Sequence, residues 1–184
     1  MRIISGQFKG RTIVAPKTNN TRPTSDRARE SLFNILTHAA WAPHFEGARV
    51  LDLFAGSGGL GLEAMSRGAE YCLFVETAHA ARGAIRDNIE TLGLYGATKI
   101  HRRSAIDLGA LVGLEPFDLI FMDPPYHKGL VEPCLRSLVD GGWLADDALI
   151  VVETAADEQP DFEGWQLHAD RKIGAAKVWF VSCD

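Results

Sequence analysis

The fold of this chain is decided by the stretch Val50-Leu51-Asp52-Leu53-Phe54-Ala55-Gly56-Ser57-Gly58-Gly59-Leu60-Gly61. Its apolar first half predicts a buried strand over residues 48–54. Its second half predicts a tight turn into a helix over 60–67, because glycine lets the backbone turn and approach a ligand closely. The glycines match G-x-G-x-x-G, a spacing that presents free helix amides to a nucleotide-like ligand. A dinucleotide would satisfy this pattern too, and a lone glycine motif also occurs as a structural turn.

A second strand with a carboxylate at its end strengthens the ligand-binding interpretation. Residues 71–75 form an apolar strand that ends at Glu76, twenty residues beyond Gly56. A carboxylate at this point can accept hydrogen bonds from ribose hydroxyls. The order strand, glycine loop, helix, strand and acidic residue therefore favours a nucleoside-cofactor site over a structural turn.

The alternation of strands and helices continues almost to the C-terminus. A helix between Glu76 and Gly93 is followed by further predicted elements: strands over 98–102, 117–122 and 148–152, helices over 107–112 and 129–139, and a hairpin over 165–172 and 177–181. We therefore expect an α/β fold, a doubly wound, Rossmann-like and mostly parallel sheet with an antiparallel C-terminal hairpin. Such sheets bind ligands at the carboxyl ends of their strands.

The tetrapeptide Asp123-Pro124-Pro125-Tyr126 follows the apolar strand over 117–122, at the same sheet edge as the glycine loop. The prolines restrict the backbone and hold the Asp123 carboxylate and the Tyr126 ring in a preset relation. Asp123 and the Pro124 carbonyl can accept the hydrogens of a nucleobase amino group, while Tyr126 stacks on the base. Beside a nucleoside cofactor, this arrangement favours methyl transfer from a sulfonium to an amino group. The alternative is a strand-ending turn, for which Asp and Pro are ordinary residues.

The first part of the chain differs from the rest in charge. Residues 1–37 hold seven Lys and Arg against two acidic residues, a net charge of +5, whereas the whole chain carries −5. We divide the chain into a basic extension over 1–43 and a compact domain over 44–184. A basic extension can dock on a polyanion such as nucleic acid, although a solvated hairpin would show the same charge.

Within the extension, loose alternation over 3–15 predicts a short β-hairpin. A helix is expected to begin at Thr24 or Ser25, either of which can cap it. Its periodic apolar face holds Ala28, Leu32, Ile35, Leu36 and Ala39.

Length and cysteine usage limit the class of protein. The 184 residues, 46% of them hydrophobic, suffice for one globular domain with a substantial core. Cys72, Cys134 and Cys183 are unclustered, which fits reduced thiols, and no Cys or His spacing predicts a metal site. No run approaches the roughly 18 apolar residues of a membrane span. We therefore expect a cytoplasmic protein with neither a metal nor a membrane partner.

Several motifs resemble those of a known family. Residues 50–58 are similar to the cofactor motif of class I S-adenosylmethionine-dependent methyltransferases, and 123–126 to their amino-methylating motif. The N-terminal runs resemble the bacterial RsmD family, which methylates N2 of a guanine in 16S ribosomal RNA. These runs are Arg2-Ile3-Ile4-Ser5-Gly6, Lys9-Gly10-Arg11, Arg22-Pro23-Thr24 and Arg29-Glu30-Ser31-Leu32-Phe33-Asn34-Ile35-Leu36.

The resemblance implies S-adenosylmethionine as cofactor, with S-adenosylhomocysteine as product. Its site would comprise Asp52, Phe54, Gly56, Ser57, Gly58, Glu76, Ser104, Ala105 and Asp123. Within it, Asp52 and the glycines would line the methionine and ribose end, and Glu76 would bind the ribose hydroxyls. Ser104 and Ala105 would border the adenine, although relatives commonly carry Asp where this chain has Ser104. The catalytic residues would be Asp123, Pro124 and Tyr126.

The resemblance also implies that the extension reaches RNA. Phosphate contacts would come from Arg2, Lys9, Arg11, Arg22, Arg27 and Arg29. For Arg29 the alternative is an ion pair with a nearby carboxylate that orients the helix. The expected partner is 16S ribosomal RNA, in the small subunit or an assembly intermediate, bound by a monomer. Three other functions stay open: a DNA adenine-N6 methyltransferase, a non-catalytic RNA-binding assembly factor, and a nicotinamide oxidoreductase that shares the glycine loop.

Overall fold

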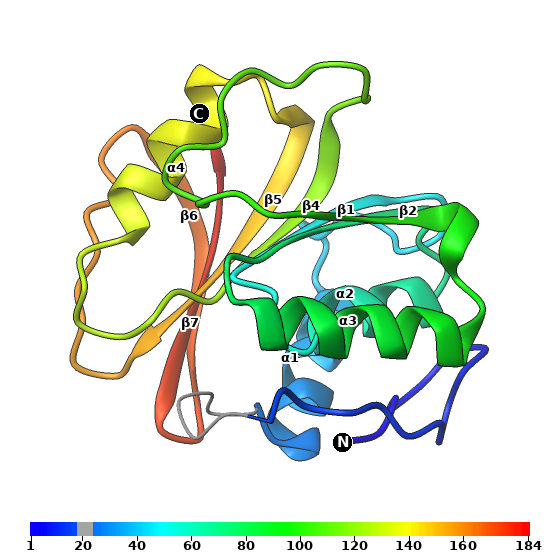
Figure 1. Cartoon of the computed structure of the whole chain (residues 1–184). Coiled ribbons are helices and arrows are strands. Elements are labelled where there is room, and N and C mark those ends of the chain that lie inside the picture. Colours follow the sequence, from blue (N-terminus) through cyan, green and yellow to red (C-terminus); the bar gives the residue numbers. More distant parts are fainter. Residues whose placement is uncertain (18–23) are drawn as a thin grey trace.

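The computed structural model describes residues 1–17 and 24–184, and within them seven strands form one sheet in the order β3-β2-β1-β4-β5-β7-β6 (Figure 1). The strands are β1 (Arg49–Leu53), β2 (Tyr71–Val75), β3 (Thr98–His101), β4 (Phe117–Met122), β5 (Leu144–Ala155), β6 (Trp165–Ile173) and β7 (Ala176–Cys183). Strands β1 to β5 pair in parallel, whereas β7 lies antiparallel between β5 and β6. The predicted α/β fold with an antiparallel C-terminal hairpin is confirmed.

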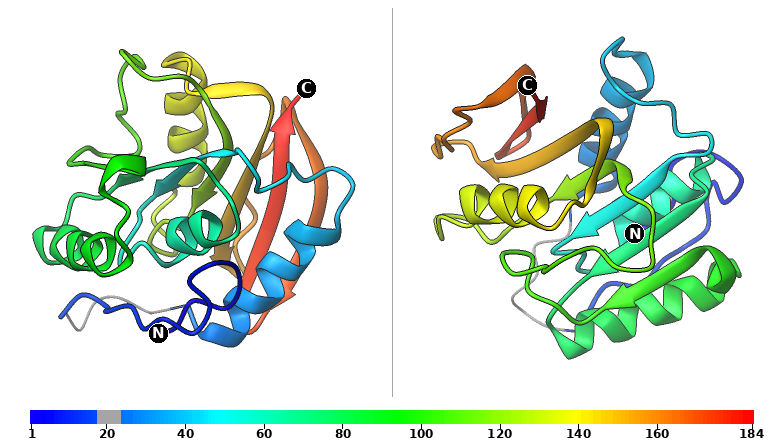
Figure 2. Two further views of the ribbon diagram at one scale, coloured as in Figure 1. Left: turned by 90° about the vertical axis from the view of Figure 1, so that its right-hand side faces the viewer. Right: turned by 90° about the horizontal axis from the view of Figure 1, so that it is seen from above.

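Helices cover both faces of the sheet, as the views in Figure 2 show. The helices are α1 (Asp26–His38), α2 (Gly59–Ser66), α3 (His79–Leu92) and α4 (Val131–Asp140), with a short 3-10 turn at Tyr95–Ala97. Side chains of α1, α2 and α3 share one apolar cluster, and those of α4 belong to the other. The burial of both strand faces explains why β1, β2 and β4 are almost continuously apolar.

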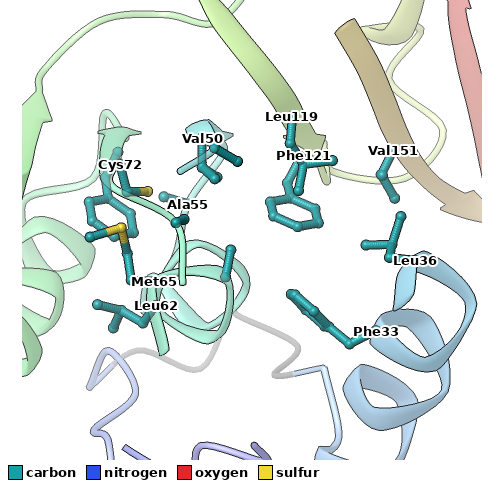
Figure 3. Close-up of a cluster of buried hydrophobic side chains, with 14 of the residues drawn as sticks. Phe33, Leu36, Val50, Ala55, Leu62, Met65, Cys72, Leu119, Phe121 and Val151 are labelled. Atoms are coloured by element: carbon teal, nitrogen blue, oxygen red, sulfur yellow. The ribbon is translucent and has the colours of Figure 1, made fainter. Parts of the chain in front are cut away.

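The larger cluster joins the N-terminal helix to the sheet (Figure 3). Phe33 and Leu36 of α1 lie toward Phe121 of β4 and Val151 of β5, and the ring centroids of Phe33 and Phe121 are 5.6 Å apart. Each fully buried side chain of this size contributes about 1.5–3 kcal/mol. The division into an extension over 1–43 and a domain over 44–184 stays a prediction. Helix α1, which that division assigns to the extension, packs into the same core as the sheet.

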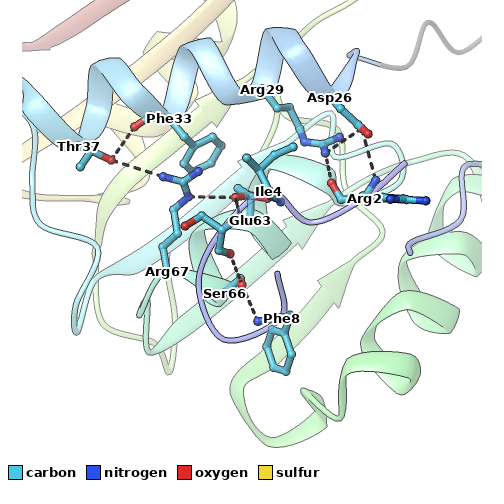
Figure 4. Close-up of polar contacts among 11 residues, drawn as sticks. Arg2, Ile4, Phe8, Asp26, Arg29, Phe33, Thr37, Glu63, Ser66 and Arg67 are labelled. Carbon is cyan, nitrogen blue, oxygen red and sulfur yellow. Dashed lines mark hydrogen bonds and ion pairs between the residues drawn. The ribbon is translucent and has the colours of Figure 1, made fainter. Parts of the chain in front are cut away.

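Residues 1–17, which we call the arm, correct one prediction. The arm does fold back on itself, but it holds one antiparallel bridge, between Arg2 and Thr12, in place of the regular strands of the predicted β-hairpin. Several of its backbone hydrogen bonds join the two sides of the arm, such as those from the Ile3 amide to the Arg11 carbonyl and from the Ile13 amide to the Met1 carbonyl, both 3.0 Å. Other arm amides bond to α2: the Glu63 carboxylate accepts from Ile4 (2.8 Å) and Ser5 (3.0 Å), as Figure 4 shows for Ile4. The arm is therefore an irregular segment fastened to α2 by a side chain that is itself fully buried.

Two further predictions needed correction. The expected helix over 107–112 is wrong: Gly109 has φ 70°, and the Leu108 and Leu111 amides donate to the Ser137 hydroxyl and the Gly141 carbonyl of the α4 region. A helix cannot form there because these amides are used by another element. Helix α1 begins after Ser25, which caps the Ala28 amide as predicted. Its buried face holds the predicted Leu32 and Leu36, with Ile35 partly buried against the same core. Arg29 and Phe33 are buried as well, which the predicted face did not include.

Candidate active site

The glycine loop connects β1 to α2 and is held by a buried carboxyl group. Asp52 is 1% exposed, and its Oδ2 accepts a hydrogen bond from the Gly61 amide at 2.9 Å. A Cβ at Gly61 would lie 2.6 Å from both Cys72 Sγ and Phe74 Cε1, so only glycine allows α2 to approach the sheet this closely. Phe54, the first loop residue, adopts a left-handed φ of 56°, a conformation that costs a non-glycine residue energy.

Burial changes the acidity of Asp52. Removal of the carboxyl from water raises its pKa to about 8; the Gly61 amide opposes this rise and the Glu76 charge adds to it. The carboxyl is thus largely protonated at neutral pH when no cation lies beside it. A cationic ligand in contact with Asp52 would favour the ionised form and release a proton.

Glu76 at the end of β2 is oriented by two backbone amides. Its Oε2 accepts from Gly56 at 2.9 Å and its Oε1 from Ala78 at 3.0 Å. Each carboxylate oxygen keeps further acceptor capacity, which can serve the hydroxyls of a ribose. Because Glu76 bonds directly to the glycine loop, a ligand on that loop meets this carboxylate.

The tetrapeptide at 123–126 follows β4, which pairs with β1 so that Met122 lies beside Leu53. Pro124 is buried, and the Tyr126 hydroxyl donates to Glu153 Oε1 on β5 at 3.0 Å. That bond limits rotation of the half-buried Tyr126 ring. The adjacent strands thereby place the tetrapeptide directly beside the glycine loop.

Both loops line one cavity of about 680 Å³, within the usual range for small-molecule sites. The predicted site residues that line it are Asp52, Phe54, Gly56, Ser57, Glu76, Asp123, Pro124 and Tyr126. Three predicted cofactor residues lie outside its lining. Gly58 is buried at the start of α2, Ser104 is exposed with its carbonyl accepting from the Asp107 amide, and Ala105 is buried in the α4-side cluster. The adenine contact of Ser104 and Ala105 stays a prediction.

Other cavity residues were not identified from the sequence. They include Met1, Pro16, Thr24, Leu60 and Thr77. Thr24 belongs to the Arg-Pro-Thr run and Thr77 follows Glu76 directly, so each lies in or beside a motif that the sequence analysis had identified. Met1 and Pro16 had no local signal, because only the docking of the arm brings them to the glycine loop.

The basic residues expected to contact RNA divide into two groups. The side chains of Arg2, Lys9, Arg11 and Arg27 are exposed, and Arg11 also donates to the Thr91 carbonyl at 2.7 Å. Arg29 is 1% exposed and points inward, where its Nη2 donates to the Arg2 carbonyl and to Asp26 at 3.1 Å. Its geometry agrees with the alternative of an ion pair that orients the helix. Arg22 lies outside the described residues.

Neither a membrane span nor a metal cluster occurs in the part of the chain that the structure describes. Within residues 1–17 and 24–184, no helix is both long and apolar enough to cross a membrane. In the same residues, no three His, Cys, Asp or Glu side chains gather where they could hold a metal ion.

Comparison with known proteins identifies the family. Residues 1–182 match the family described as Conserved hypothetical protein 95. The chain belongs to this family. As a member of the Conserved hypothetical protein 95 family, it is 40% identical over 176 residues to Ribosomal RNA small subunit methyltransferase D of Escherichia coli (strain K12), covering 95% of this chain and 85% of that protein. The resemblance to the RsmD family is thereby confirmed.

Two more relatives agree over nearly the full length. Ribosomal RNA small subunit methyltransferase D of Haemophilus influenzae is 35% identical over 179 residues, covering 95% of this chain and 89% of that protein. The solved structure of the yhhF protein of Escherichia coli superposes with a TM-score of 0.81 at 36% identity, covering 100% of this chain and 98% of that chain. The alignment with that structure therefore spans the arm and α1 as well as the sheet.

Proposed function

We propose that this chain transfers a methyl group from S-adenosylmethionine to the exocyclic N2 of a guanine in 16S ribosomal RNA. One observation carries the proposal: the glycine loop and the tetrapeptide at 123–126 line the same cavity. A cofactor site and an amino-group site must adjoin for direct methyl transfer, because the reacting atoms have to come within about 3–3.5 Å. The relatives named ribosomal RNA small subunit methyltransferase D support the choice of RNA and of subunit.

The residues present fit the proposed cofactor. Glu76 offers carboxylate oxygens to a ribose, and Asp52 offers a buried carboxyl group to a cationic amino-acid portion. When bound, S-adenosylmethionine supplies an activated methyl group on a sulfonium. A nicotinamide cofactor would also fit the glycine loop, but hydride transfer gives no role to the residues that follow β4.

The tetrapeptide positions the acceptor. The lone pair of a guanine amino group is delocalised into the ring, which makes it a weak nucleophile. Asp123 and the Pro124 carbonyl accept hydrogen bonds from the two amino hydrogens and orient the lone pair toward the methyl group; the single proton displaced by methylation passes to solvent. Tyr126, held by Glu153, stacks on the base, an interaction worth about 1–3 kcal/mol and comparable with the cost of unstacking it. Positioning therefore supplies most of the rate enhancement.

The arm supplies electrostatic attraction to the RNA. Arg2, Lys9 and Arg11 expose cationic groups on a segment that also contributes Met1 and Pro16 to the cavity. RNA phosphates bound by the arm would thus lie close to the site of transfer. We further propose that the protein acts as a monomer on cytoplasmic ribosomal subunits or their assembly intermediates.

The test is incubation with radiolabelled S-adenosylmethionine and small ribosomal subunits that lack the modification, followed by digestion of the RNA and identification of the labelled nucleoside. We expect N2-methylguanosine. Label in N6-methyladenosine would replace the guanine assignment with an adenine one. Absence of label from both subunits and naked 16S RNA would favour a non-catalytic binding factor. Parallel reactions with Asp123→Ala control for a contaminating enzyme.

A further inference from the structure

Arg29 is a buried cation whose hydrogen-bonding capacity is only partly used. Its Nη2 bonds to the Arg2 carbonyl and to Asp26, as drawn in Figure 4. Its Nε and Nη1 are buried without a hydrogen-bond partner among the described residues. Nη1 carries two N–H donors and Nε one. Buried donors of a charged group are costly to leave unpaired, so an anionic group bound at this position would be strongly favoured.

The Arg29 side chain lies beside the glycine loop. It lines the same cavity as Asp52 and Glu76. A Cβ built on Gly59, the first residue of α2, would lie 3.8 Å from Arg29 Cδ and 3.0 Å from Met1 Sδ. The Met1 thioether thus covers this part of the cavity, and its unbranched, flexible side chain can move aside for a ligand.

The start of α2 favours an anion at the same position. Helix α2 has no side-chain cap at Gly58 and no acidic residue in its first turn. Amides at a helix N-terminus carry partial positive charge and point toward the preceding loop. Two independent features, the helix start and the buried guanidinium, therefore converge on one wall of the cavity.

We propose that Arg29 binds the carboxylate of the methionine portion of S-adenosylmethionine. This inference rests on the proposed function, because it assumes that this cofactor occupies the cavity. Glu76 binds the ribose from the β2 side of the glycine loop, and Arg29 approaches that loop from the α1 side, so the two residues hold the ribose and the methionine portion from different sides of the loop. An RNA phosphate is a poor ligand for Arg29, because a group 1% exposed beneath the arm cannot be reached by a polymer backbone.

The assignment changes the role of the first helix. Asp26 and the Arg2 carbonyl hold the Arg29 guanidinium through Nη2. Its Nε and Nη1 donors then remain for a ligand in the cavity. Arg29 is then a cofactor-binding residue that also fastens the arm, whereas RNA recognition belongs to the exposed Arg2, Lys9 and Arg11.

The test compares two ligands that differ only in the carboxylate: S-adenosylmethionine and decarboxylated S-adenosylmethionine, which keeps the sulfonium and the amine. Calorimetric titration of the wild-type protein should give about 10- to 100-fold tighter binding of the carboxylated ligand. In Arg29→Gln this preference should fall to about twofold or less, with the affinity for the decarboxylated ligand nearly unchanged. Arg86→Gln, the same charge change at an exposed position of α3, should keep the full preference.

Equal affinity of the wild-type protein for the two ligands would overturn the inference, and this measurement needs no variant. An equal loss of both affinities in Arg29→Gln would overturn it as well, because it would show a purely structural role. If the wild-type protein bound neither ligand, the proposed function itself would fail. Thermal unfolding of each variant establishes that the affinities refer to folded protein.

Discussion

Asn88 on α3 donates a hydrogen bond from Nδ2 to the Ser57 carbonyl in the glycine loop at 3.0 Å. The same side chain pairs with both backbone groups of Val14 in the arm, accepting from its amide at 2.8 Å and donating to its carbonyl at 2.9 Å. Asn88 is 1% exposed. The buried side-chain amide of Asn88 therefore joins the arm to the glycine loop, so that each segment stabilises the conformation of the other.

Asn88→Ala should destabilise the protein and weaken cofactor binding together. Removal of the amide leaves Val14 and Ser57 with unpaired backbone groups, at a cost of about 1–3 kcal/mol in the free energy of unfolding. Urea denaturation measures this loss, and calorimetry should show several-fold weaker binding of S-adenosylmethionine. Asp87→Ala, an exposed neighbour on α3, should change stability by less than about 0.5 kcal/mol. Unchanged cofactor affinity in Asn88→Ala would show that the arm and loop are independent.

Gly61→Ala should be destabilising although alanine favours helices. The added Cβ would meet Cys72 and Phe74 at 2.6 Å and Asp52 Oδ2 at 3.0 Å, and overpacking of this kind costs about 1–3 kcal/mol. The matched control is Gly83→Ala on α3, where a Cβ has nothing within 4 Å and should stabilise by up to about 1 kcal/mol. Thermal or urea unfolding of both variants provides the comparison. Similar effects at the two positions would contradict the close approach of α2 to the sheet.

Asp52 should make stability depend on pH. Its pKa in the folded protein, about 8, exceeds the ordinary value of 3.8, so the folded state binds more protons between those values. The contribution of Asp52 to the free energy of unfolding is therefore fully present below about pH 4. It is lost as the pH rises to about 8, with a slope of at most about 1.4 kcal/mol per pH unit.

The measurement for Asp52 is the difference in unfolding free energy between the wild-type protein and Asp52→Asn. Because the other titrating groups are common to both proteins, they cancel in the difference. The stability of the wild type relative to Asp52→Asn should fall steadily from pH 5 to pH 8. A difference that stays constant over this range would mean that the carboxyl is already ionised throughout it.

Tyr126 should affect methylation through its ring more than through its hydroxyl. Tyr126→Ala removes the stacking surface, and a loss of about 1–3 kcal/mol corresponds to roughly 5- to 150-fold in kcat/KM for RNA. Tyr126→Phe keeps the ring and removes the hydroxyl that bonds to Glu153, so its effect should be several-fold at most. Single-turnover methylation with saturating cofactor measures both. Equal decreases in the two variants would assign the effect to the hydroxyl.

Asp123→Asn should lower the rate of methyl transfer and leave RNA binding nearly intact. The amide keeps one acceptor oxygen but lacks the negative charge that makes hydrogen bonds of the carboxylate about twice as strong. We expect a decrease in kcat of about 10²- to 10³-fold. Filter binding of 16S RNA gives the control. A parallel decrease in RNA affinity would indicate that Asp123 acts in binding rather than in positioning the amino group.

The exposed cations of the arm should set the salt dependence of RNA binding. Replacement of Arg2 and Lys9 by Ala should weaken binding and reduce the slope of log K against log salt by about 0.7–0.9 for each phosphate that the protein no longer neutralises. Lys172→Ala, an exposed cation on the edge strand β6, is the control and should leave the slope unchanged. An identical slope for the wild type and the Arg2, Lys9 double variant would exclude the arm as the phosphate-binding segment.

Much of the site was predictable because its parts are local in sequence. The strand, glycine loop and helix at 50–61, Glu76, and the tetrapeptide at 123–126 each carry a short pattern with its own physical reason. Parallel strands end at one sheet edge, so the same reasoning also brought these parts together, and the shared cavity agrees with it.

The sequence by itself therefore determined the fold class, the family and the two loops that meet in the cavity. Only the tertiary structure decided that the Arg29 side chain is buried and that the arm forms no regular strands. In the sequence, Arg29 is one more basic residue of a basic segment, with a helix-orienting ion pair as the alternative. In the structure, its bonds to Asp26 and to the Arg2 carbonyl hold it inward. Alternation in the arm suggested two strands, yet Glu63, Ser66 and Asn88 accept hydrogen bonds from individual arm amides, and a single bridge joins the two sides of residues 1–17. Both outcomes depend on partners distant in sequence, and a local pattern carries no information about which of them will meet.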